Sequence, residues 1–267
     1  MADITAELVR TLRDKTNAGM MDCKKALTET NGDIEAAETL LRKKGILKAG
    51  SKADRQTKEG VIHALVNGTA GVLIEVNCET DFVAKNDNFK AFVTALSDKL
   101  ASGAESGSAE VDEYVKSKIA EMGENIVLRR VEKYAAADGL LASYIHLGGR
   151  VGVLLQATAP DTDAARAVLK DVAMHIAASN PRFLSRDQVS ADFIAREREI
   201  AAEQVKDKPA NIVDKIVSGK IDKILAENCL LEQSFIKNPD INVKDHVKSG
   251  GDITVQRFVR YAVGEEA

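Results

Sequence analysis

The amino-acid sequence predicts an α+β fold with an N-terminal three-helix bundle, a duplicated antiparallel sheet-plus-helix core and an inserted helical hairpin. Three observations predict this arrangement. Apolar residues recur at helical spacing as far as Gly45. A strand, a glycine-containing turn and a second strand then occur twice, at an offset of 79 residues, as the pair Gly60 and Gly139 illustrates. Two amphipathic helical patterns interrupt the second copy before its last strand.

The composition is that of a water-soluble globular protein. The chain has 267 residues, of which 45% are hydrophobic and 29% are charged. Aromatic residues make up 4% and tryptophan is absent, which predicts small cores packed by aliphatic side chains. The formal net charge of -4 argues against general binding of nucleic acid or of anionic membranes. A shaped protein surface is therefore the expected partner.

Cysteine usage and targeting signals indicate the compartment. Three cysteines lie far apart and form no C-x-x-C pair: Cys23, Cys78 and Cys229. This spacing predicts neither a disulfide framework nor a zinc site, so reduced thiols are expected. The sequence shows no signal-peptide pattern and no run of about 18 apolar residues. We therefore expect a cytoplasmic protein that does not associate with membranes.

Motifs for cofactors and catalysis are missing. The sequence contains neither G-x-x-x-x-G-K-[ST] nor a strand-associated G-x-G-x-x-G, so we expect no cofactor and no direct nucleotide binding. Four histidines show no metal-ligand spacing with the cysteines: His63, His146, His175 and His246. A thiol hydrolase could be assembled from Cys78, His63 and Asp81, but these residues form no local signature. We predict that the protein is not an enzyme.

Residues 1–55 are predicted to form a helical domain that ends in a basic linker. Three short amphipathic patterns indicate three helices, and Asp33 is placed to cap the third. This helix is expected to end at Gly45. The linker that follows (46–59) is rich in lysine and arginine, which are either simply solvated or attract an acidic partner.

Two short motifs in this domain resemble a ubiquitin-associated (UBA) module. Gly19-Met20-Met21 opens one helix, and Asn31-Gly32-Asp33-Ile34 opens the next. The resemblance implies a UBA-like bundle that presents an apolar surface before its second helix, here Met20 and Met21. The residues alone also allow a second interpretation, in which both methionine side chains fill the small core.

Residues 56–137 are predicted to form the first core subdomain. Apolar residues alternate over 72–76 as in a half-buried strand, and a helix beginning near Phe89 follows. Between strand and helix lies Thr80-Asp81-Phe82-Val83, whose first two residues are suited to cap a helix. Two orientations of Phe82 are possible. In the first, its side chain packs the first helical turn against the core; in the second, it points outward, where a partner would bury it.

The second core subdomain is predicted to be discontinuous, comprising 138–180 and 229–264. Its hairpin and helix repeat the pattern of the first subdomain. The insertion at 181–228 consists of two amphipathic helices that meet at Lys208-Pro209. A helical hairpin placed before the sheet is complete is suited to self-association, so we expect a homodimer through it.

Four segments that span most of the chain in order resemble bacterial elongation factor Ts. They are residues 20–27, 76–85, 123–126 and 150–153, and Thr80-Asp81-Phe82-Val83-Ala84-Lys85 within the second is the most specific. The resemblance implies a guanine-nucleotide exchange factor for the GTPase elongation factor Tu, acting in translation elongation. It implies no cofactor in the factor itself.

The same resemblance implies roles for individual residues. Phe82 would act as an apolar wedge between helices of the GTPase, with Asp81 beside it, near the magnesium site of the partner. GDP release would follow from disturbance of that site. The partner-binding residues that the resemblance implies are Asp81, Phe82, Thr80, Val83, His146, Met20, Met21, Lys24, Lys52, Met122 and Gly123.

Two functions of other classes remain as alternatives. A UBA-type adaptor would hold another protein through its N-terminal module and would have no exchange activity. A nucleic-acid-binding protein would use the basic linker, which the acidic net charge disfavours. An effect of excess GDP on partner binding would distinguish the exchange factor from both.

Overall fold

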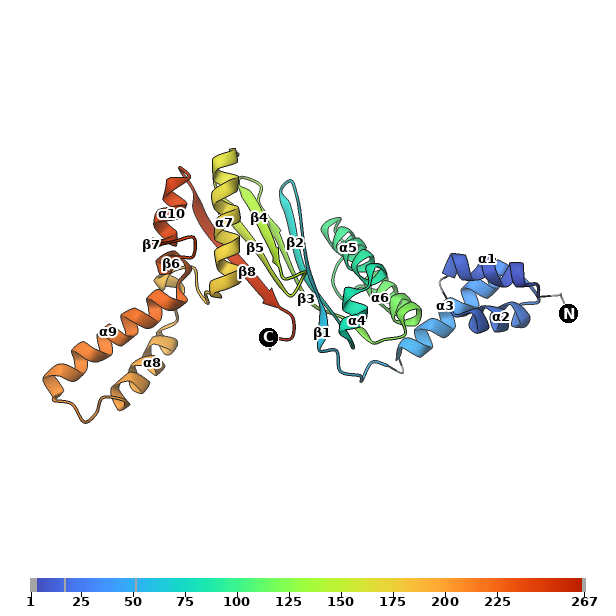
Figure 1. The fold of residues 1–267 in the computed structure, drawn as a ribbon, viewed down its shortest axis with the longest axis horizontal. Helices are drawn as coiled ribbons and strands as arrows, with labels where there is room; N and C mark the ends of the chain where they lie inside the picture. Colours follow the sequence, from blue (N-terminus) through green and yellow to red (C-terminus); the bar gives the residue numbers. More distant parts are fainter. Residues whose placement is uncertain (1–3, 17, 51, 266–267) are drawn as a thin grey trace.

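The computed structural model describes residues 4–16, 18–50 and 52–265. Its centre is a helix–sheet–sheet–helix sandwich (Figure 1). Helices α1 to α3 lie at one end of the molecule and the α8–α9 hairpin lies at the other, with both sheets between them. The fold is α+β, as the sequence predicts. In the part of the chain described, no helix is long and apolar enough to cross a lipid bilayer.

Three helices form the N-terminal bundle: α1 (Ala6–Thr16), α2 (Met20–Glu29) and α3 (Ile34–Gly50). Leu12, Cys23 and Leu27 are completely buried at its centre. Asp33 caps α3 as predicted, because its carboxylate accepts a hydrogen bond from the backbone N–H of Ala36 at 3.0 Å. The bundle fits the UBA-like module that the sequence suggests.

The predicted end of α3 at Gly45 is wrong, because the helix continues to Gly50. A Cβ at position 45 would lie 2.9 Å from the Cβ of Ala120 in α6 (Ala109–Met122). This glycine therefore allows α3 and α6 to pack closely and does not stop the helix. Sequence patterns do not distinguish a glycine that ends a helix from one that faces a neighbouring helix.

The first core unit contains an antiparallel sheet in the order β1-β2-β3. Its strands are β1 (Glu59–Asn67), β2 (Ala70–Cys78) and β3 (Ile126–Ala135). The short helix α4 (Asp81–Lys85) follows β2, and α5 (Asp87–Ala101) and α6 cover one face of the sheet. Ile74, Phe89 and Leu96 are completely buried between sheet and helices, since the alternation of β2 meets the apolar stripe of α5.

The second core unit contains an antiparallel sheet in the order β4-β5-β8. Its strands are β4 (Leu140–His146), β5 (Val151–Thr158) and β8 (Thr254–Ala262). Helix α7 (Asp163–Ser179) covers this sheet and buries Leu169 and Ile176 against Leu155. Three small elements that the sequence pattern did not predict precede β8: β6 (Ser234–Phe235), β7 (Asn238–Asn242) and α10 (Val243–Ser249).

The insertion is a hairpin of α8 (Ala191–Glu203) and α9 (Ala210–Asn228). Short 3-10 turns flank it at Arg186–Gln188 and Leu230–Glu232. Its two helices bury Ala201 and Val217 in a small core of their own. The backbone N–H groups of Arg182 and Phe183 donate to the carbonyl of Asn228, which closes the base of the hairpin. Self-association through the hairpin stays a prediction.

The strand register corrects the predicted repeat. Both sheets carry a β-bulge in the outer strand that pairs with the central one. The pairing skips Arg129 of β3 opposite Glu75 and Val76, and it skips Gln256 of β8 opposite Gln156 and Ala157. The central strands are therefore offset by 81 residues, and the predicted offset of 79 holds for the first strands only. The cause is the turn, because residues 147–150 connect β4 to β5 whereas only Gly68 and Thr69 connect β1 to β2.

The outer strands β3 and β8 extend the duplication. Glu75 faces Arg130 across the first sheet, and Gln156 faces Arg257 across the second. Each arginine then stacks on a tyrosine of the other sheet. Arg130 lies 4.2 Å from the ring centroid of Tyr261, and Arg257 lies 4.0 Å from that of Tyr134. Two reciprocal arginine–tyrosine contacts therefore join the two units.

Two equivalent glycines bring the sheets face to face. A Cβ at Gly152 would lie 2.4 Å from a methyl carbon of Ile62, and one at Gly71 would lie 3.0 Å from side-chain carbons of Leu141 and Leu154. These apolar residues belong to one cluster buried between the sheets. The strands that present the candidate site are therefore part of a single packed core.

Candidate functional site

Helix α4 presents the most exposed large apolar side chain in the part of the chain described. Phe82 is 82% exposed, although β2, which ends shortly before it at Cys78, is almost entirely buried. Thr80 is the N-cap, and its hydroxyl accepts a hydrogen bond from the backbone N–H of Val83 at 3.3 Å. Val83 and Ala84 pack toward the first core. Of the two alternatives for Phe82, the structure therefore supports the outward orientation and not the core staple.

Asp81 lies beside Phe82 at the first position of α4. Its carboxylate accepts a hydrogen bond from the ammonium of Lys85 at 2.6 Å, one helical turn further on. This hydrogen bond holds the pKa of Asp81 below its ordinary value. The exposed end of α4 thus combines a large apolar ring with an ionised carboxylate.

The turn between α6 and β3 holds the segment before α4 through Glu124. The carboxylate of Glu124 accepts hydrogen bonds from the backbone N–H groups of Glu79 and Thr80, both at 3.0 Å. It also accepts one from the Thr80 hydroxyl at 2.6 Å. In return, the backbone N–H of Asn125 donates to the Glu79 carboxylate at 2.6 Å. Two segments far apart in sequence are therefore held together next to the start of α4.

The same turn binds the linker from the N-terminal bundle. The Lys52 ammonium donates to the carbonyl of Gly123 at 2.5 Å. The side-chain amide of Asn125 donates to the carbonyls of Ala53 and Arg55, at 3.2 and 2.9 Å. Part of the linker is therefore docked on the first core unit and is not simply a solvated chain. Lys52 and Gly123, which the sequence resemblance names separately, lie in contact.

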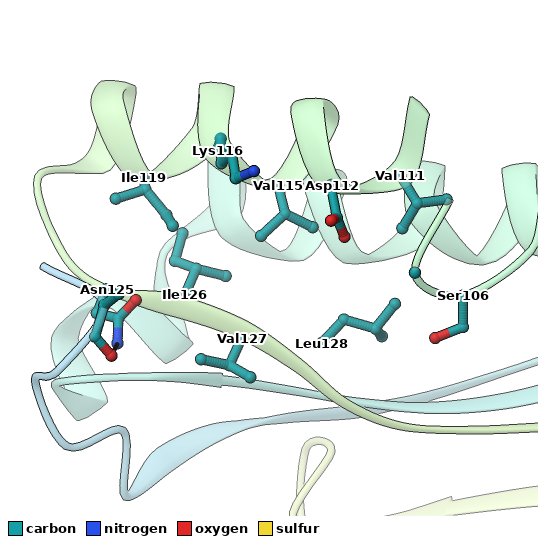
Figure 2. A pocket seen from close by; sticks show the side chains of 12 residues that line it. Ser106, Val111, Asp112, Val115, Lys116, Ile119, Asn125, Ile126, Val127 and Leu128 are labelled. Carbon is teal, nitrogen blue, oxygen red and sulfur yellow. Dashed lines mark hydrogen bonds between the residues drawn. The ribbon is translucent and has the colours of Figure 1, made fainter. Parts of the chain in front are cut away.

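Met122 precedes this turn at the end of α6 and is partly buried against the first core. A shallow hollow lies next to the turn, between α6 and β3 (Figure 2). Val115 and Ile119 face it from the helix and Ile126 from the strand, with Asn125 at one end. Its mostly apolar lining is suited to contact with protein and offers no pairing of a nucleophile with a base.

His146 ends β4 and is exposed. Its Nδ1 lies 3.1 Å from the Tyr144 hydroxyl, and the two rings stack. Leu147 follows with 69% exposure and a positive φ of 50°. The turn is fixed against the first sheet, because Ile62 donates its backbone N–H to the carbonyl of Gly149 at 2.7 Å. Helix α4 also packs against β1, so the His146 turn and α4 flank the same strand.

Met20 and Met21 open α2 and are 58% and 64% exposed. The alternative in which they fill the core of the bundle is therefore wrong, and Cys23 and Leu27 take that place. Lys24 lies next to them, and all three line a depression between α1 and α2. This patch belongs to the bundle at the end of the molecule, whereas α4 lies beside the first sheet (Figure 1).

The arrangement of Cys78, His63 and Asp81 does not support thiol chemistry. The Cys78 thiol is buried and donates to the carbonyl of Thr80 at 3.2 Å. Burial, together with the nearby carboxylates of Glu124 and Glu59, raises its pKa to about 12. His63 Nδ1 is instead within 2.9 Å of the Ser97 hydroxyl. Across the described ranges, no group of three or more His, Cys, Asp or Glu side chains is placed to hold a metal ion.

Two features of the site were not predicted from the sequence. Glu124 occurs in a motif noted for its resemblance, but its hydrogen-bond partners lie 44 and 45 residues away and no local pattern reveals them. Leu147 lies in a turn before two glycines. A large apolar residue in such a turn could have indicated an exposed contact residue. Both belong to the surface that presents α4 and the His146 turn.

The sequence was compared with models of protein families. The sequence model of the family described as Elongation factor TS matches residues 79–265. The matched region begins at the end of β2 and includes Phe82, the turn at 123–125 and His146. It does not include Met20, Met21, Lys24 or Lys52.

Proposed function

Because the chain belongs to the elongation factor Ts family, we propose that this translation elongation factor accelerates GDP release from the GTPase elongation factor Tu. The observation that supports the proposal most directly is the 82% exposure of Phe82 on a capped helix. Such a ring packs little of its surface against the free protein. It becomes useful when a partner buries it.

The proposed activity makes and breaks no covalent bond. If the factor weakens GDP binding to the GTPase, GDP weakens factor binding by the same ratio, because the coupling free energy is shared. The factor must therefore stabilise a partner conformation in which magnesium and phosphate ligands are displaced. Burying one phenylalanine supplies about 1.5–3 kcal/mol. A magnesium ion that bridges phosphates is among the largest local charges of such a site, so a small displacement weakens GDP binding strongly.

The surface around Phe82 supports the same proposal. Asp81 is held ionised by Lys85. Its negative charge, next to the wedge, would repel the phosphate of GDP and compete with it for contact with magnesium. The exposed His146 turn flanks the same strand and would form a second contact. Met20, Met21, Lys24, Lys52, Met122 and Gly123 would extend the contact toward the N-terminal bundle.

Other parts of the chain have proposed roles within this function. Residues 1–55 would act as a binding module and linker. Residues 56–137 would be the unit that carries the wedge, while 138–180 with 229–264 would supply the His146 contact. The insertion at 181–228 would pair two copies of the chain. A cytoplasmic site of action belongs to the same proposal.

The test is release of a fluorescent GDP analogue from elongation factor Tu in the presence of excess unlabelled GDP. The unaltered chain should accelerate release at micromolar concentration, and Phe82→Ala should reduce this acceleration. Ile236→Ala is a matched control, because Ile236 is also an exposed apolar residue, at 42%, but lies in the second unit, directly after β6. No acceleration by the unaltered chain would refute the proposal.

An adaptor would behave differently in a binding assay. Capture of elongation factor Tu by the immobilised chain should decrease when excess GDP is added, because of the shared coupling energy. An adaptor that uses Met20 and Met21 would capture its partner equally well with and without GDP. Loss of capture in a Met20→Ala, Met21→Ala double variant with no response to GDP would favour the adaptor.

A further inference from the structure

We propose that Glu124 is a positioning residue that holds α4 so that Phe82 points away from the protein. The inference rests on the proposed function for its effect on GDP release, whereas the position of α4 can be measured in the free chain. Phe82 is the contacting residue, and Glu124 acts on the partner only through it. Glu124 is connected to α4 by the hydrogen bonds that it accepts from Glu79 and from Thr80, the N-cap of this helix.

Helix α4 cannot fix its own orientation. It has five residues, fewer than the length at which a helix is stable without tertiary support. Phe82 contributes no anchor because it is exposed, and the hydrogen bond from Lys85 to Asp81 stays within the helix. Val83 and Ala84 attach the helix to the first core, and Asn86 joins its end to α5. The start of the helix is attached at the Thr80 cap.

Glu124 determines the position of that cap. One carboxylate oxygen accepts from the backbone N–H groups of Glu79 and Thr80, and the other accepts from the Thr80 hydroxyl. The Thr80 hydroxyl oxygen in turn accepts from the backbone N–H of Val83 inside α4. A continuous chain of hydrogen bonds therefore runs from the α6–β3 turn, through the cap, into the first turn of the helix.

The chemistry of this position specifies which substitutions matter. Three donors converge on Glu124, and a carboxylate offers only acceptors. In Glu124→Gln, the amide oxygen can still accept from both backbone N–H groups, and the amide N–H can donate to the Thr80 hydroxyl oxygen. In Glu124→Ala, all three donors lose their acceptor, so the segment that precedes Phe82 is released. The two variants form a matched pair.

The first test measures the orientation of residue 82 in the free chain. Because the sequence contains no tryptophan, Phe82→Trp creates a single fluorescent reporter on α4. Steady-state anisotropy of this reporter should fall when Glu124→Ala is added and should stay unchanged with Glu124→Gln. Hydrogen exchange at the N–H of Val83 should accelerate with Glu124→Ala alone. Unchanged anisotropy and exchange with Glu124→Ala would overturn the inference.

The second test measures whether Glu124 acts through Phe82. At saturating factor, Glu124→Ala should slow the maximal rate of GDP release by about tenfold or more, since small misplacements of a contacting group have effects of this size. In a Phe82→Ala background the same change should alter the rate less than about twofold. A merely structural role for Glu124 would lower the folded fraction equally in both backgrounds. Equal effects in both would therefore overturn the inference.

The two tests separate failure of the inference from failure of the proposed function. If the unaltered chain does not accelerate GDP release, the proposed function fails, and the anisotropy measurement still decides whether Glu124 positions α4. If the unaltered chain accelerates release and Glu124→Ala does so equally well while folded, the inference alone fails. Thermal unfolding of each variant establishes the folded fraction.

Discussion

Replacement of Phe82 by alanine should leave the free protein almost as stable as before. The side chain is 82% exposed, so its removal opens no cavity, and surface changes of this kind usually alter the free energy of unfolding by less than about 0.5 kcal/mol. Phe89, seven residues further along, is completely buried in the first core. Phe89→Ala should therefore cost about 3–5 kcal/mol through a cavity.

The assay is thermal unfolding of both variants beside the unaltered chain. For a protein of this size each kcal/mol lowers Tm by about 2–4 °C, so Phe89→Ala should lower Tm by about 6–20 °C and Phe82→Ala by no more than about 2 °C. In complex formation the order should reverse. A buried aromatic at the centre of an interface is worth about 2 kcal/mol or more, so Phe82→Ala should weaken binding to elongation factor Tu by about thirtyfold.

Two results would contradict this prediction. If Phe82→Ala lowered Tm by as much as Phe89→Ala, and if the fraction still folded promoted GDP release normally, then Phe82 would be a structural residue and no wedge. A normal Tm together with normal release would also contradict the binding half of the prediction. Ile236→Ala, which should change neither quantity, shows whether loss of any exposed apolar residue has an effect.

Three further predictions concern other parts of the chain. Asn125→Ala removes the hydrogen bonds to the linker carbonyls and should weaken factor binding while leaving the maximal release rate at saturation within about twofold; a titration of release rate against factor concentration measures both, and a lower maximum at unchanged affinity would contradict it. Ile200→Lys combined with Ile212→Lys introduces charge at two exposed apolar positions of the hairpin and should abolish self-association measured by sedimentation, without slowing GDP release; a monomeric unaltered chain would contradict the homodimer. Burial lowers the pKa of His175 below its ordinary value of about 6.5. The unfolded chain therefore takes up the proton first as pH falls below about 6.5, and the free energy of unfolding measured with urea should decrease from about pH 7.5 to about pH 5.5. His175→Gln should show a shallower decrease, and equal slopes for the two chains would contradict the assignment to His175.

Much of the fold follows from local patterns. Alternation over 72–76 identifies a strand because one face of β2 must meet α5, and the helical stripe beginning at Phe89 identifies that helix. Asp33 identifies the start of α3 because a cap acts within one turn. These features depend on residues that are close in sequence, so the sequence alone suffices to predict them.

Features that depend on distant contacts were not predicted. Gly45 has the pattern of a helix end, but it lies inside α3, where the approach of Ala120 leaves little room for a side chain. The equivalence of β3 and β8 is hidden because different lengths of chain precede them. It emerges from the pairing of Arg130 with Glu75 and of Arg257 with Gln156, each next to a bulge. The pairing of residues between strands depends on the folded structure and cannot be derived from the spacing of residues along one strand.

For the site, the sequence predicted the segment but not its support. The unusual position of Phe82 between a strand and a helix was visible as a pattern, and its two alternatives could be stated but not decided. Burial decided between them. The role of Glu124 could not be predicted, because its acceptors meet donors that come from a different part of the chain.

The separation of β5 from β8 determines when each half of the core can be completed during synthesis. All three strands of the first sheet have been synthesised once Ala135 is added, so that unit can close early. The second sheet has to wait for Thr254, where β8 begins, and β5 keeps an open edge in the meantime. An open edge is a hazard for pairing with other chains. The inserted hairpin therefore lengthens the time during which the nascent chain needs protection, and any delay in translation between these two strands extends it.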